Sequence, residues 1–428
     1  MIDLPALTQF RVEPQDNGLV HFVFDCPGRT MNVFSEAAIE DLGRFAEWLA
    51  DAPVKGALIR SGKDNAFCAG ADLTELGVAY DMIVAAPERK RFNLAFDHFF
   101  RLSLACRALE TAGKPVAVAV AGLALGGGCE LTLAAHHRVL VDDPKVAMGL
   151  PESLVGLLPG AGGTQRLPRL IGIEAALPIL LEGARLSGQA AVDAGLAHAL
   201  AAPGEEIARA EAWLLSAPEA KQPWDRDGWI APAGGDVAAT IGPVRERILA
   251  ETLGHYPAPL AILDCLEFGL PQVFDGAIRT EMSIFAHLIQ REEARNMIQT
   301  LFLGRTDHDR LARKDALPSV VREAVDAVNR ALSDVADAAA LRHAGFSLPA
   351  GEKVAPVRQR AGRGYWIEGA DAVAPEAKRH IDSISAAVAP LAADRSPEEL
   401  RIADYAIVQA TGYPAYLGGP FAYLRRGG

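Results

Sequence analysis

The sequence has 428 residues, of which half are hydrophobic and 22% are charged, so it can bury a sizeable core in more than one domain. This composition is typical of a globular protein rather than a disordered one. The formal net charge of -12 argues against binding to nucleic acid, which requires a basic surface, and against binding to an anionic membrane.

The first part of the chain alternates between strand and helix patterns. The apolar strand at 116–120 leads into a glycine cluster and then into a helix from about Cys129. Ser35 is a suitable N-cap for a helix with apolar residues at 3.6-residue spacing. Together these patterns predict an α/β domain. The other predicted strands cover residues 19–24, 54–59, 138–141 and 146–148, and the other predicted helices cover 35–50 and 88–109.

Strand signals fade after about Leu186, and the rest of the sequence predicts mostly helices. A loop rich in Pro, Gly and Trp covers residues 217–236, and a polar stretch at 304–315 indicates a boundary. The expected helices cover residues 189–200, 205–215, 244–253, 258–268 and 275–301. We therefore divide the chain into a core at 1–200, a helical extension at 201–305 and a helical C-terminal region at 316–428.

The sequence predicts neither a targeting segment nor a membrane span. Residues 1–5 contain no basic segment followed by an apolar one, so we expect no signal peptide. The longest apolar run, 115–129, is interrupted by glycines and ends at Glu130, which makes it too short to span a membrane. The cysteines are odd in number and lack CxxC spacing, which favours reduced thiols in a cytoplasmic protein over a disulfide framework or a zinc site. They are Cys26, Cys68, Cys106, Cys129 and Cys265.

Three glycines before a predicted helix form the most informative motif, Gly126-Gly127-Gly128-Cys129-Glu130. Consecutive glycines let a ligand approach the backbone closely, and N–H groups at a helix N-terminus carry the positive end of the helix dipole. This arrangement suits an oxyanion that develops during a reaction, with Glu130 beside the donors. The alternative is that Glu130 only stabilises the helix N-terminus, and the spacing alone does not decide between the two.

A glycine-rich turn between a strand and a helix can also bind a dinucleotide. The G-x-G-x-x-G pattern fails here, because the sixth position is Leu131 when counted from Gly126 and Gln165 when counted from Gly160. We therefore predict that this turn does not bind NAD.

The other polar candidates carry less information when taken singly. Glu152 follows Pro151 and is either a turn carboxylate at the surface or a carboxylate directed into a pocket. His136 and His137 have no Cys or acidic neighbours at metal-binding spacing, which favours a structural role and predicts no metal site. No Ser or Cys occupies a G-x-S-x-G nucleophile motif.

Three segments together resemble the crotonase (enoyl-CoA hydratase/isomerase) superfamily. They are 67–73 (FCAGADL), 126–130 (GGGCE), and 149–152 (GLPE) with 159–167 (PGAGGTQRL). The resemblance covers roughly residues 10–200 and implies a spiral of ββα units, followed here by mostly helical regions. It implies that the N–H groups of Ala71 and Gly127 form an oxyanion hole and that Glu130 and Glu152 are the catalytic carboxylates. The residues implied to bind substrate are Ala69, Gly70, Asp72, Leu73 and Gly126.

The later part of the chain resembles the bacterial multifunctional fatty-acid oxidation α-subunit. Residues 244–303 are similar to its linker helix, and residues 362–366 and 411–420 are similar to the end of its 3-hydroxyacyl-CoA dehydrogenase part. Between Leu303 and Gly362 there is no room for the NAD-binding domain. Residues 316–428 are therefore interpreted as a helical remnant of the dehydrogenase part, in a chain that binds no NAD.

The resemblance implies an enoyl-CoA hydratase that converts a trans-2-enoyl-CoA into a 3-hydroxyacyl-CoA. Retention of both glutamates is the pattern of hydratases. Two alternatives stay open: a Δ3,Δ2-enoyl-CoA isomerase, and a non-catalytic assembly subunit of a fatty-acid oxidation complex. CoA is part of the substrate, so no separate cofactor is expected. The expected partners are further copies of this chain in a homo-oligomer and a thiolase or another β-oxidation subunit, while the acyl chain length is not determined by the sequence.

The C-terminal region keeps large apolar side chains that need to be covered. We expect them to pack against the hydratase core, a second subunit or the mouth of the acyl pocket, because an exposed apolar patch marks an interface. The alternative is a small helical unit that folds on itself. The residues are Tyr365, Trp366, Ile407, Tyr413, Tyr416, Leu417, Phe421 and Tyr423.

Overall fold

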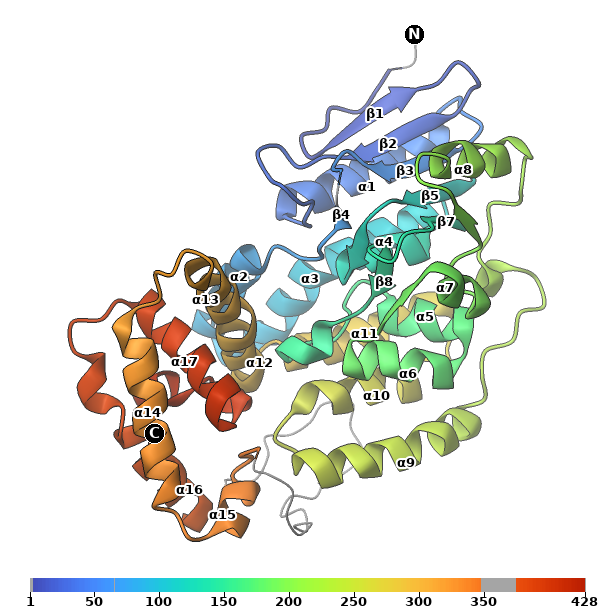
Figure 1. Ribbon diagram of the computed structural model, residues 1–428. Helices are drawn as coiled ribbons and strands as arrows, with labels where there is room; N and C mark the ends of the chain where they lie inside the picture. Colours follow the sequence, from blue (N-terminus) through green and yellow to red (C-terminus); the bar gives the residue numbers. More distant parts are fainter. Residues whose placement is uncertain (1–2, 65, 348–374, 428) are drawn as a thin grey trace. The chain divides into compact units, whose positions relative to one another are not determined.

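The computed structural model describes residues 3–64, 66–347 and 375–427 (Figure 1). The chain forms two compact units. The first unit consists of residues 1–153, 158–240 and 262–286, and the second consists of residues 154–157, 241–261 and 287–428. Residues 362–366, which resemble the dehydrogenase part, lie outside the described residues.

Two sheets lie at the centre of the first unit. Their strands are β1 (Phe10–Pro14), β2 (Val20–Phe24), β3 (Ala57–Ser61), β4 (Ala66–Cys68), β5 (Val116–Val120), β6 (Leu123–Leu125), β7 (His137–Val141), β8 (Ala147–Gly149), β9 (Arg185–Ser187) and β10 (Ala199–Ala201). The first sheet has the order β1-β2-β3-β5-β7-β10, with antiparallel pairing at β1 and β2 and parallel pairing elsewhere. The second sheet has the order β4-β6-β8-β9, with antiparallel pairing at β8 and β9.

A repeated strand–strand–helix order builds both sheets. β3 joins the first sheet and β4 joins the second before α2 (Leu73–Ala85), and β5 and β6 do the same before α4 (Gly127–Ala134). Gly122 lies where the chain passes from one sheet to the other. A Cβ there would lie 2.6 Å from the Cα of Ala66 in β4, so a side chain at position 122 would force this segment away from β4. The predicted α/β fold of ββα units is confirmed.

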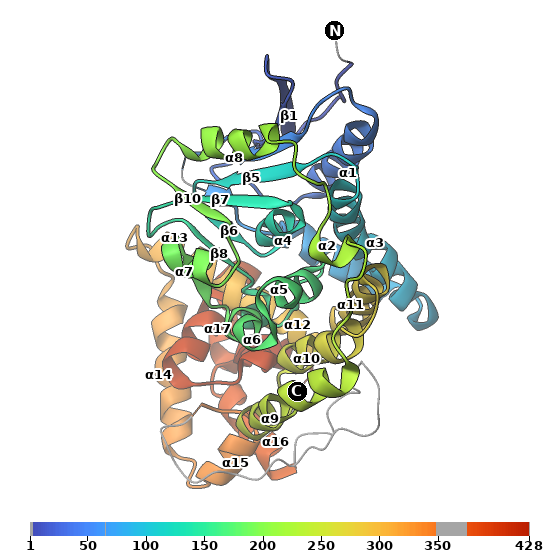
Figure 2. The same cartoon turned by 90° about the vertical axis from the view of Figure 1, so that its right-hand side faces the viewer.

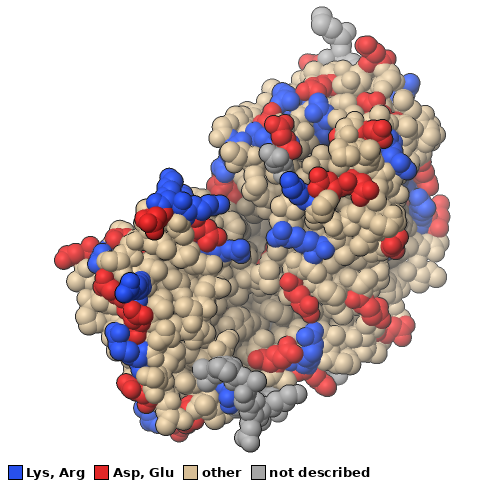
Figure 3. Space-filling model, viewed as in Figure 1, with Lys and Arg blue, Asp and Glu red and all other residues tan. Residues whose placement is uncertain are grey.

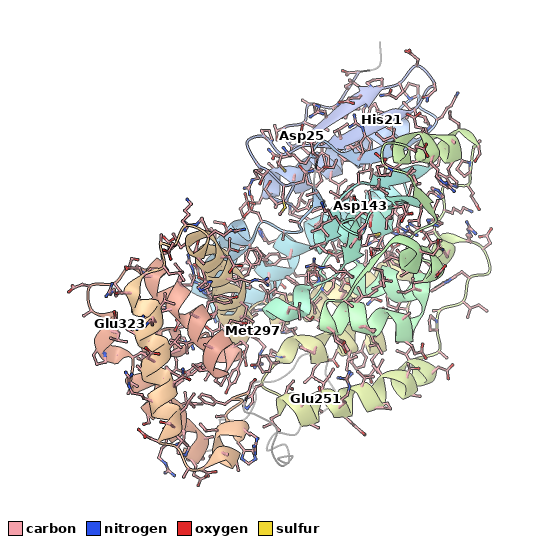
Figure 4. The ribbon with its side chains drawn as sticks, in the orientation of Figure 1. His21, Asp25, Asp143, Glu251, Met297 and Glu323 are labelled. Carbon is pink, nitrogen blue, oxygen red and sulfur yellow. The ribbon has the colours of Figure 1, made fainter. Side chains whose placement is uncertain are left out.

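Helices cover both faces of the first sheet. β5 reads Val-Ala-Val-Ala-Val and is buried throughout, as expected for a parallel strand covered on both sides. His21 of β2, labelled in Figure 4, bonds to Glu211 of α8 (Glu206–Leu215) at 2.6 Å. Its neighbour Phe22 faces the opposite side, where it stacks on Phe45 of α1 (Glu36–Asp51) with ring centroids 3.8 Å apart. Figure 2 shows α8 lying along β5 and β7.

Several helix predictions for this unit are confirmed and two are corrected. Ser35 caps α1 by accepting a hydrogen bond from the N–H of Ala38 at 3.3 Å. α2 was not predicted. The helix expected over 189–200 is wrong, because α7 ends at Asp193, Gly195 adopts a φ of 79°, and the chain continues into β10. The other helices up to residue 288 are α3 (Glu88–Glu110), η1 (Glu152–Val155), α5 (Gly163–Ile171), α6 (Ile173–Glu182), α7 (Gly188–Asp193), η2 (Pro223–Asp225), α9 (Gly234–Thr252), α10 (Pro257–Gly269) and α11 (Phe274–Leu288), of which η1, α9, α10 and α11 include residues of both units.

The second unit is helical. The helix expected over 275–301 is interrupted, because α11 ends at Leu288 and α12 begins at Glu292. The polar stretch at 304–315 was expected to be a boundary, but most of it is helical and forms α13. The helices are α12 (Glu292–Met297), the π-helix η3 (Ile298–Gly304), α13 (Arg305–Ala312), α14 (Ser319–Ser333), α15 (Ala338–His343), α16 (Pro375–Ala386), η4 (Ala389–Ala392), α17 (Pro397–Thr411), η5 (Ala415–Leu417) and α18 (Pro420–Arg425).

The large apolar side chains of the C-terminal region lie inside the second unit. Ile407, Tyr413 and Phe421 are at most 2% exposed and pack in one core with residues of α14, including Val320 and Val328. This packing corresponds to the alternative of a unit that folds on itself. Tyr365 and Trp366 lie outside the described residues.

The visible surface carries charges of both signs (Figure 3). On the face shown in Figure 3, Lys and Arg side chains are interspersed with Asp and Glu side chains rather than collected in one basic area. Among the helices of the described residues, none combines the length and apolar character needed to cross a bilayer.

Candidate active site

The first predicted donor, Ala71, lies in an extended segment that pairs with Phe34. The N–H of Phe34 donates to the carbonyl of Gly70 at 2.8 Å, and the N–H of Asp72 donates to the carbonyl of Phe34 at 2.9 Å. Since alternate residues of an extended chain point to opposite sides, the N–H of Ala71 points away from Phe34. Within the described part of the chain it has no hydrogen-bond acceptor, so it is available to a ligand.

The second predicted donor, Gly127, begins α4. Gly126 before it has a φ of 54°, a conformation that favours glycine, and its N–H donates to the carbonyl of Gly149 at 3.0 Å. The carbonyl of Gly126 accepts from the N–H of Glu130 at 2.9 Å, which closes the first turn. The N–H groups of Gly127 and Gly128 have no acceptor among the described residues, as expected for the first residues of a helix.

Close approach of glycines brings the two donor segments together. A Cβ added to Gly70, which has a φ of 104°, would lie 3.2 Å from the carbonyl oxygen of Leu125 and 3.6 Å from the nitrogen of Gly127. A Cβ added to Gly128 would lie 2.6 Å from the Cβ of Cys68. The residue before Ala71 therefore lies against Gly127, and side chains at these positions would separate the two segments.

Glu152 lies beside the same glycines. A Cβ on Gly126 would lie 2.8 Å from Oε1 of Glu152, and Oε2 of Glu152 is buried without a hydrogen-bond partner in the described part of the chain. Burial raises the pKa of Glu152 well above its usual value, and the charges of Glu130 and Glu281 raise it further. An unpaired buried carboxylate is costly, so these surroundings favour the protonated acid at neutral pH.

Glu130 is buried and held by backbone donors. Its Oε1 accepts from the N–H groups of Ala161 and Gly163 at 2.7 and 2.8 Å. Burial raises the pKa of Glu130 to about 7, while those two hydrogen bonds and the positive charge of Arg166 act in the opposite direction. Glu130 therefore ionises more readily than Glu152.

A third buried carboxylate, Glu281, was not predicted. Its Oε1 accepts from the N–H of Gly162 at 2.7 Å, and its Oε2 accepts from the N–H of Thr164 at 3.0 Å and from the Thr164 hydroxyl at 2.5 Å. Burial raises the pKa of Glu281, and the charge of Glu130 raises it further. The sequence contains a signal for this residue, because Glu281 lies at helical spacing between Ile278 and Phe285 on the apolar face of α11.

A buried ion pair fixes the turn between these carboxylates. Nε and Nη2 of Arg166 donate to the two carboxylate oxygens of Glu110, each at 3.0 Å, and Nη1 donates to the carbonyl of Ala161 at 2.8 Å. Both side chains are fully buried. Bidentate Arg–carboxylate pairs have a defined geometry, so this pair locks the start of α5.

The structure gives local roles to two of the residues predicted to bind substrate. Oδ1 of Asp72 caps α2 by accepting from Thr74 and Glu75, and its Oδ2 accepts from Arg29 at 2.5 Å. The N–H of Ala69 donates to the carbonyl of Asn32 at 2.9 Å. Contact of a substrate with Ala69, Gly70, Asp72, Leu73 or Gly126 stays a prediction.

The remaining candidates are structural. Nδ1 of His136 accepts from the N–H of Val116 at 3.0 Å, and its Nε2 lies 3.1 Å from the carbonyl of Glu110. His137 stacks on Trp213 with ring centroids 4.6 Å apart. Both imidazoles have pKa values lowered to about 4, chiefly by burial. Among the described residues no group of His, Cys, Asp and Glu side chains is arranged to hold a metal ion.

The sequence is similar to a known family and to several known proteins. Residues 15–220 match the family described as enoyl-CoA hydratase/isomerase. The fatty acid oxidation complex subunit alpha of Shewanella frigidimarina is 32% identical over 302 residues, which covers 70% of this chain and 41% of that protein. The protein of the same name from Shewanella loihica is 35% identical over 302 residues, which again covers 70% of this chain and 41% of that protein. This chain thus spans less than half the length of these relatives.

Solved structures with the same family names are also similar. An enoyl-CoA hydratase from Bacillus anthracis shares 22% identity with a TM-score of 0.43, covering 73% of this chain and 98% of that one. A probable enoyl-CoA hydratase/isomerase from Mycobacterium abscessus shares 28% identity with a TM-score of 0.41, covering 49% and 74%. The sequence matches confirm the resemblance to the enoyl-CoA hydratase/isomerase family over residues 15–220, and the resemblance to the fatty-acid oxidation α-subunit over 302 residues.

Proposed function

We propose that this chain adds water to the double bond of a trans-2-enoyl-CoA thioester and forms a 3-hydroxyacyl-CoA. The observation that carries the proposal is the placement of two buried carboxyls, Glu130 and Glu152, around a glycine turn with unpaired N–H donors. Burial raises the pKa of both carboxyls, but two backbone donors and Arg166 limit the pKa of Glu130 to about 7, whereas that of Glu152 lies well above its usual value. Glu130 therefore ionises first, and such a separation is typical of a paired base and acid.

The thioester carbonyl would bind at the two donors. Hydrogen bonds from the N–H groups of Ala71 and Gly127 stabilise the negative charge that develops on the carbonyl oxygen as water adds. One such donor typically contributes about 3–4 kcal/mol to the transition state. The donors need no rearrangement, because the pairing with Phe34 and the start of α4 already hold them in place.

The two carboxyls would move the protons of the reaction. Ionised Glu130 takes a proton from the water molecule as its oxygen bonds to C3, and protonated Glu152 gives a proton to C2 as the double bond is lost. The sum of these steps is the addition of one water molecule. Glu130 then holds a proton and Glu152 a charge, and one proton exchange through solvent restores the starting state.

Two alternative functions differ in the carboxyl groups that they require. A Δ3,Δ2-enoyl-CoA isomerase would need mainly Glu152, so the two N–H groups that hold Glu130 favour hydration. A non-catalytic assembly subunit would need neither carboxyl. Because the relatives are named as subunits of a complex, we also propose that this chain associates with itself or with a thiolase or another β-oxidation subunit in the cytoplasm.

The test is a spectrophotometric assay of hydration with 2-enoyl-CoA thioesters of different length and bulk. Glu130→Gln keeps an oxygen that can accept from Ala161 and Gly163, so the fold is retained. We expect this variant and Glu152→Gln each to lose about 10²–10⁴-fold in kcat. A variant with near-normal kcat would remove that residue from the mechanism, and conversion of 3-enoyl-CoA without hydration would favour the isomerase.

A further inference from the structure

Four consecutive N–H groups at the start of α5 are divided between two carboxylates. Ala161 and Gly163 donate to Glu130, whereas Gly162 and Thr164 donate to Glu281. The donors thus alternate along the turn, and one carboxylate lies on each side of it. The turn at 161–164 is therefore a shared scaffold, in which neither carboxylate can move without affecting the other.

Side-chain contacts fix the orientation of Glu281. Nε2 of Gln165 donates to Oγ1 of Thr164 and to the carbonyl of Cys265, both at 2.9 Å. Because Oγ1 of Thr164 accepts this bond, its own proton is directed to Oε2 of Glu281. Glu281 is fully buried, and its hydrogen bonds go to the turn, so it holds the turn in place and otherwise acts through its charge.

The charges around Glu281 come from several elements. Arg166 and Arg169 of α5 favour its ionised form, whereas Glu130 of α4 and Glu152 of η1 oppose it. The Cys265 thiol of α10 also faces it, and burial raises the pKa of that thiol so that it remains neutral. Two like-charged carboxylates on one turn titrate as a pair.

We propose that Glu281 is a positioning residue for Glu130, which holds the shared turn in place and competes with Glu130 for the negative charge that the turn stabilises. This inference rests on the proposed function of Glu130 as the base. The three donors to Glu281 favour a negative charge on it, and such a charge would make Glu130 harder to ionise and therefore a stronger base once it has ionised. Without Glu281 the same donors would serve Glu130 alone.

The test compares Glu281→Gln with a matched control, Asp41→Asn. Asp41 is also buried and also accepts from two backbone N–H groups, those of Thr8 and Gln9 at 2.7 and 2.6 Å, and from the Thr8 hydroxyl at 3.4 Å. Among the described residues these donors are not shared with a second carboxylate. A loss of stability that comes only from replacing a buried carboxylate by an amide should therefore appear in both variants.

The readout is the pH dependence of kcat. In Glu281→Gln we expect the rising limb to move to lower pH by about one unit, because a like charge on a neighbouring carboxylate raises a pKa and its removal lowers it again. The plateau of kcat should fall several-fold, since a weaker base accepts the proton less readily, while KM changes little. Asp41→Asn should leave the rising limb in place.

A rising limb that stays in place or moves to higher pH in Glu281→Gln would overturn the inference. If that variant does not fold, Thr164→Val can replace it, because it removes the hydroxyl donor to Glu281 and should give a smaller shift in the same direction. The absence of a shift in Thr164→Val would overturn the inference. Infrared titration of the carboxyl groups measures the ionisation of Glu130 without enzymatic turnover. The Glu130→Gln variant identifies the band of Glu130. A protein without hydratase activity in which Glu130 still ionises at lower pH after Glu281→Gln would disprove the proposed function alone.

Discussion

Replacement of Gly128 by alanine tests whether close packing of the two donor segments supports activity. A Cβ at this position would lie 2.6 Å from both the Cβ and the carbonyl oxygen of Cys68, closer than any ordinary contact. Because one of these atoms is backbone, β4 or α4 must shift. Overpacking of this kind costs about 1–3 kcal/mol, partly offset by the gain of about 1 kcal/mol for alanine over glycine in a helix.

Gly43→Ala is the matched control. Gly43 lies within α1 with open space where its Cβ would be, so this variant should gain up to about 1 kcal/mol of stability. Urea denaturation measures the free energy of unfolding, and we expect Gly128→Ala to be less stable than Gly43→Ala by about 1–3 kcal/mol. The hydration assay should show a loss of about 10²-fold in kcat for Gly128→Ala, the usual effect of a misplacement near 1 Å. Equal stability and full activity in the two variants would refute the reasoning.

Three further predictions concern the pH profile, the ion pair and the C-terminal region. The rate of hydration should increase as the pH rises through about 7, because the base Glu130 must be ionised. It should decrease at higher pH, where Glu152 loses its proton. A kcat that does not change with pH would contradict this prediction. Arg166→Met should cost roughly 3 kcal/mol by urea denaturation, because it leaves the Glu110 carboxylate buried with a single remaining arginine contact, to Arg107; a cost below about 1 kcal/mol would argue against a structural role for the pair. Truncation after Thr306 should cause aggregation detectable by light scattering, because it removes α14 and α17 from a core that includes Met297; an unchanged monodisperse protein would count against it.

The fold was predictable where local signals and packing agree. The apolar run of β5 and the cap at Ser35 appear in the structure where the sequence places them, and the helix expected from about Cys129 begins at Gly127. The helix expected at 189–200 failed because the chain pairs residues 199–201 with β7, a contact 60 residues distant in sequence that no local pattern encodes.

The candidate site was predicted only in part. The glycines and Glu130 share one motif, and Glu152 follows close behind, so the sequence groups them. Glu281 lies 117 residues from Thr164, and apart from the Thr164 hydroxyl its partners are backbone N–H groups, which leave no trace in residue type. Only the presence of an acid on an apolar helix face pointed to it.

The alternating turn also bears on which fragment of the chain can be made as a separate protein. The family match ends at residue 220, but Glu281 lies in α11. A fragment cut at that limit would leave the N–H groups of Gly162 and Thr164 without their acceptor and would uncover Arg166. Residues 262–286, which include Glu281, belong to the same unit as this turn. A fragment that keeps the donors of this turn satisfied must therefore extend through Glu281, beyond the limit of the family match.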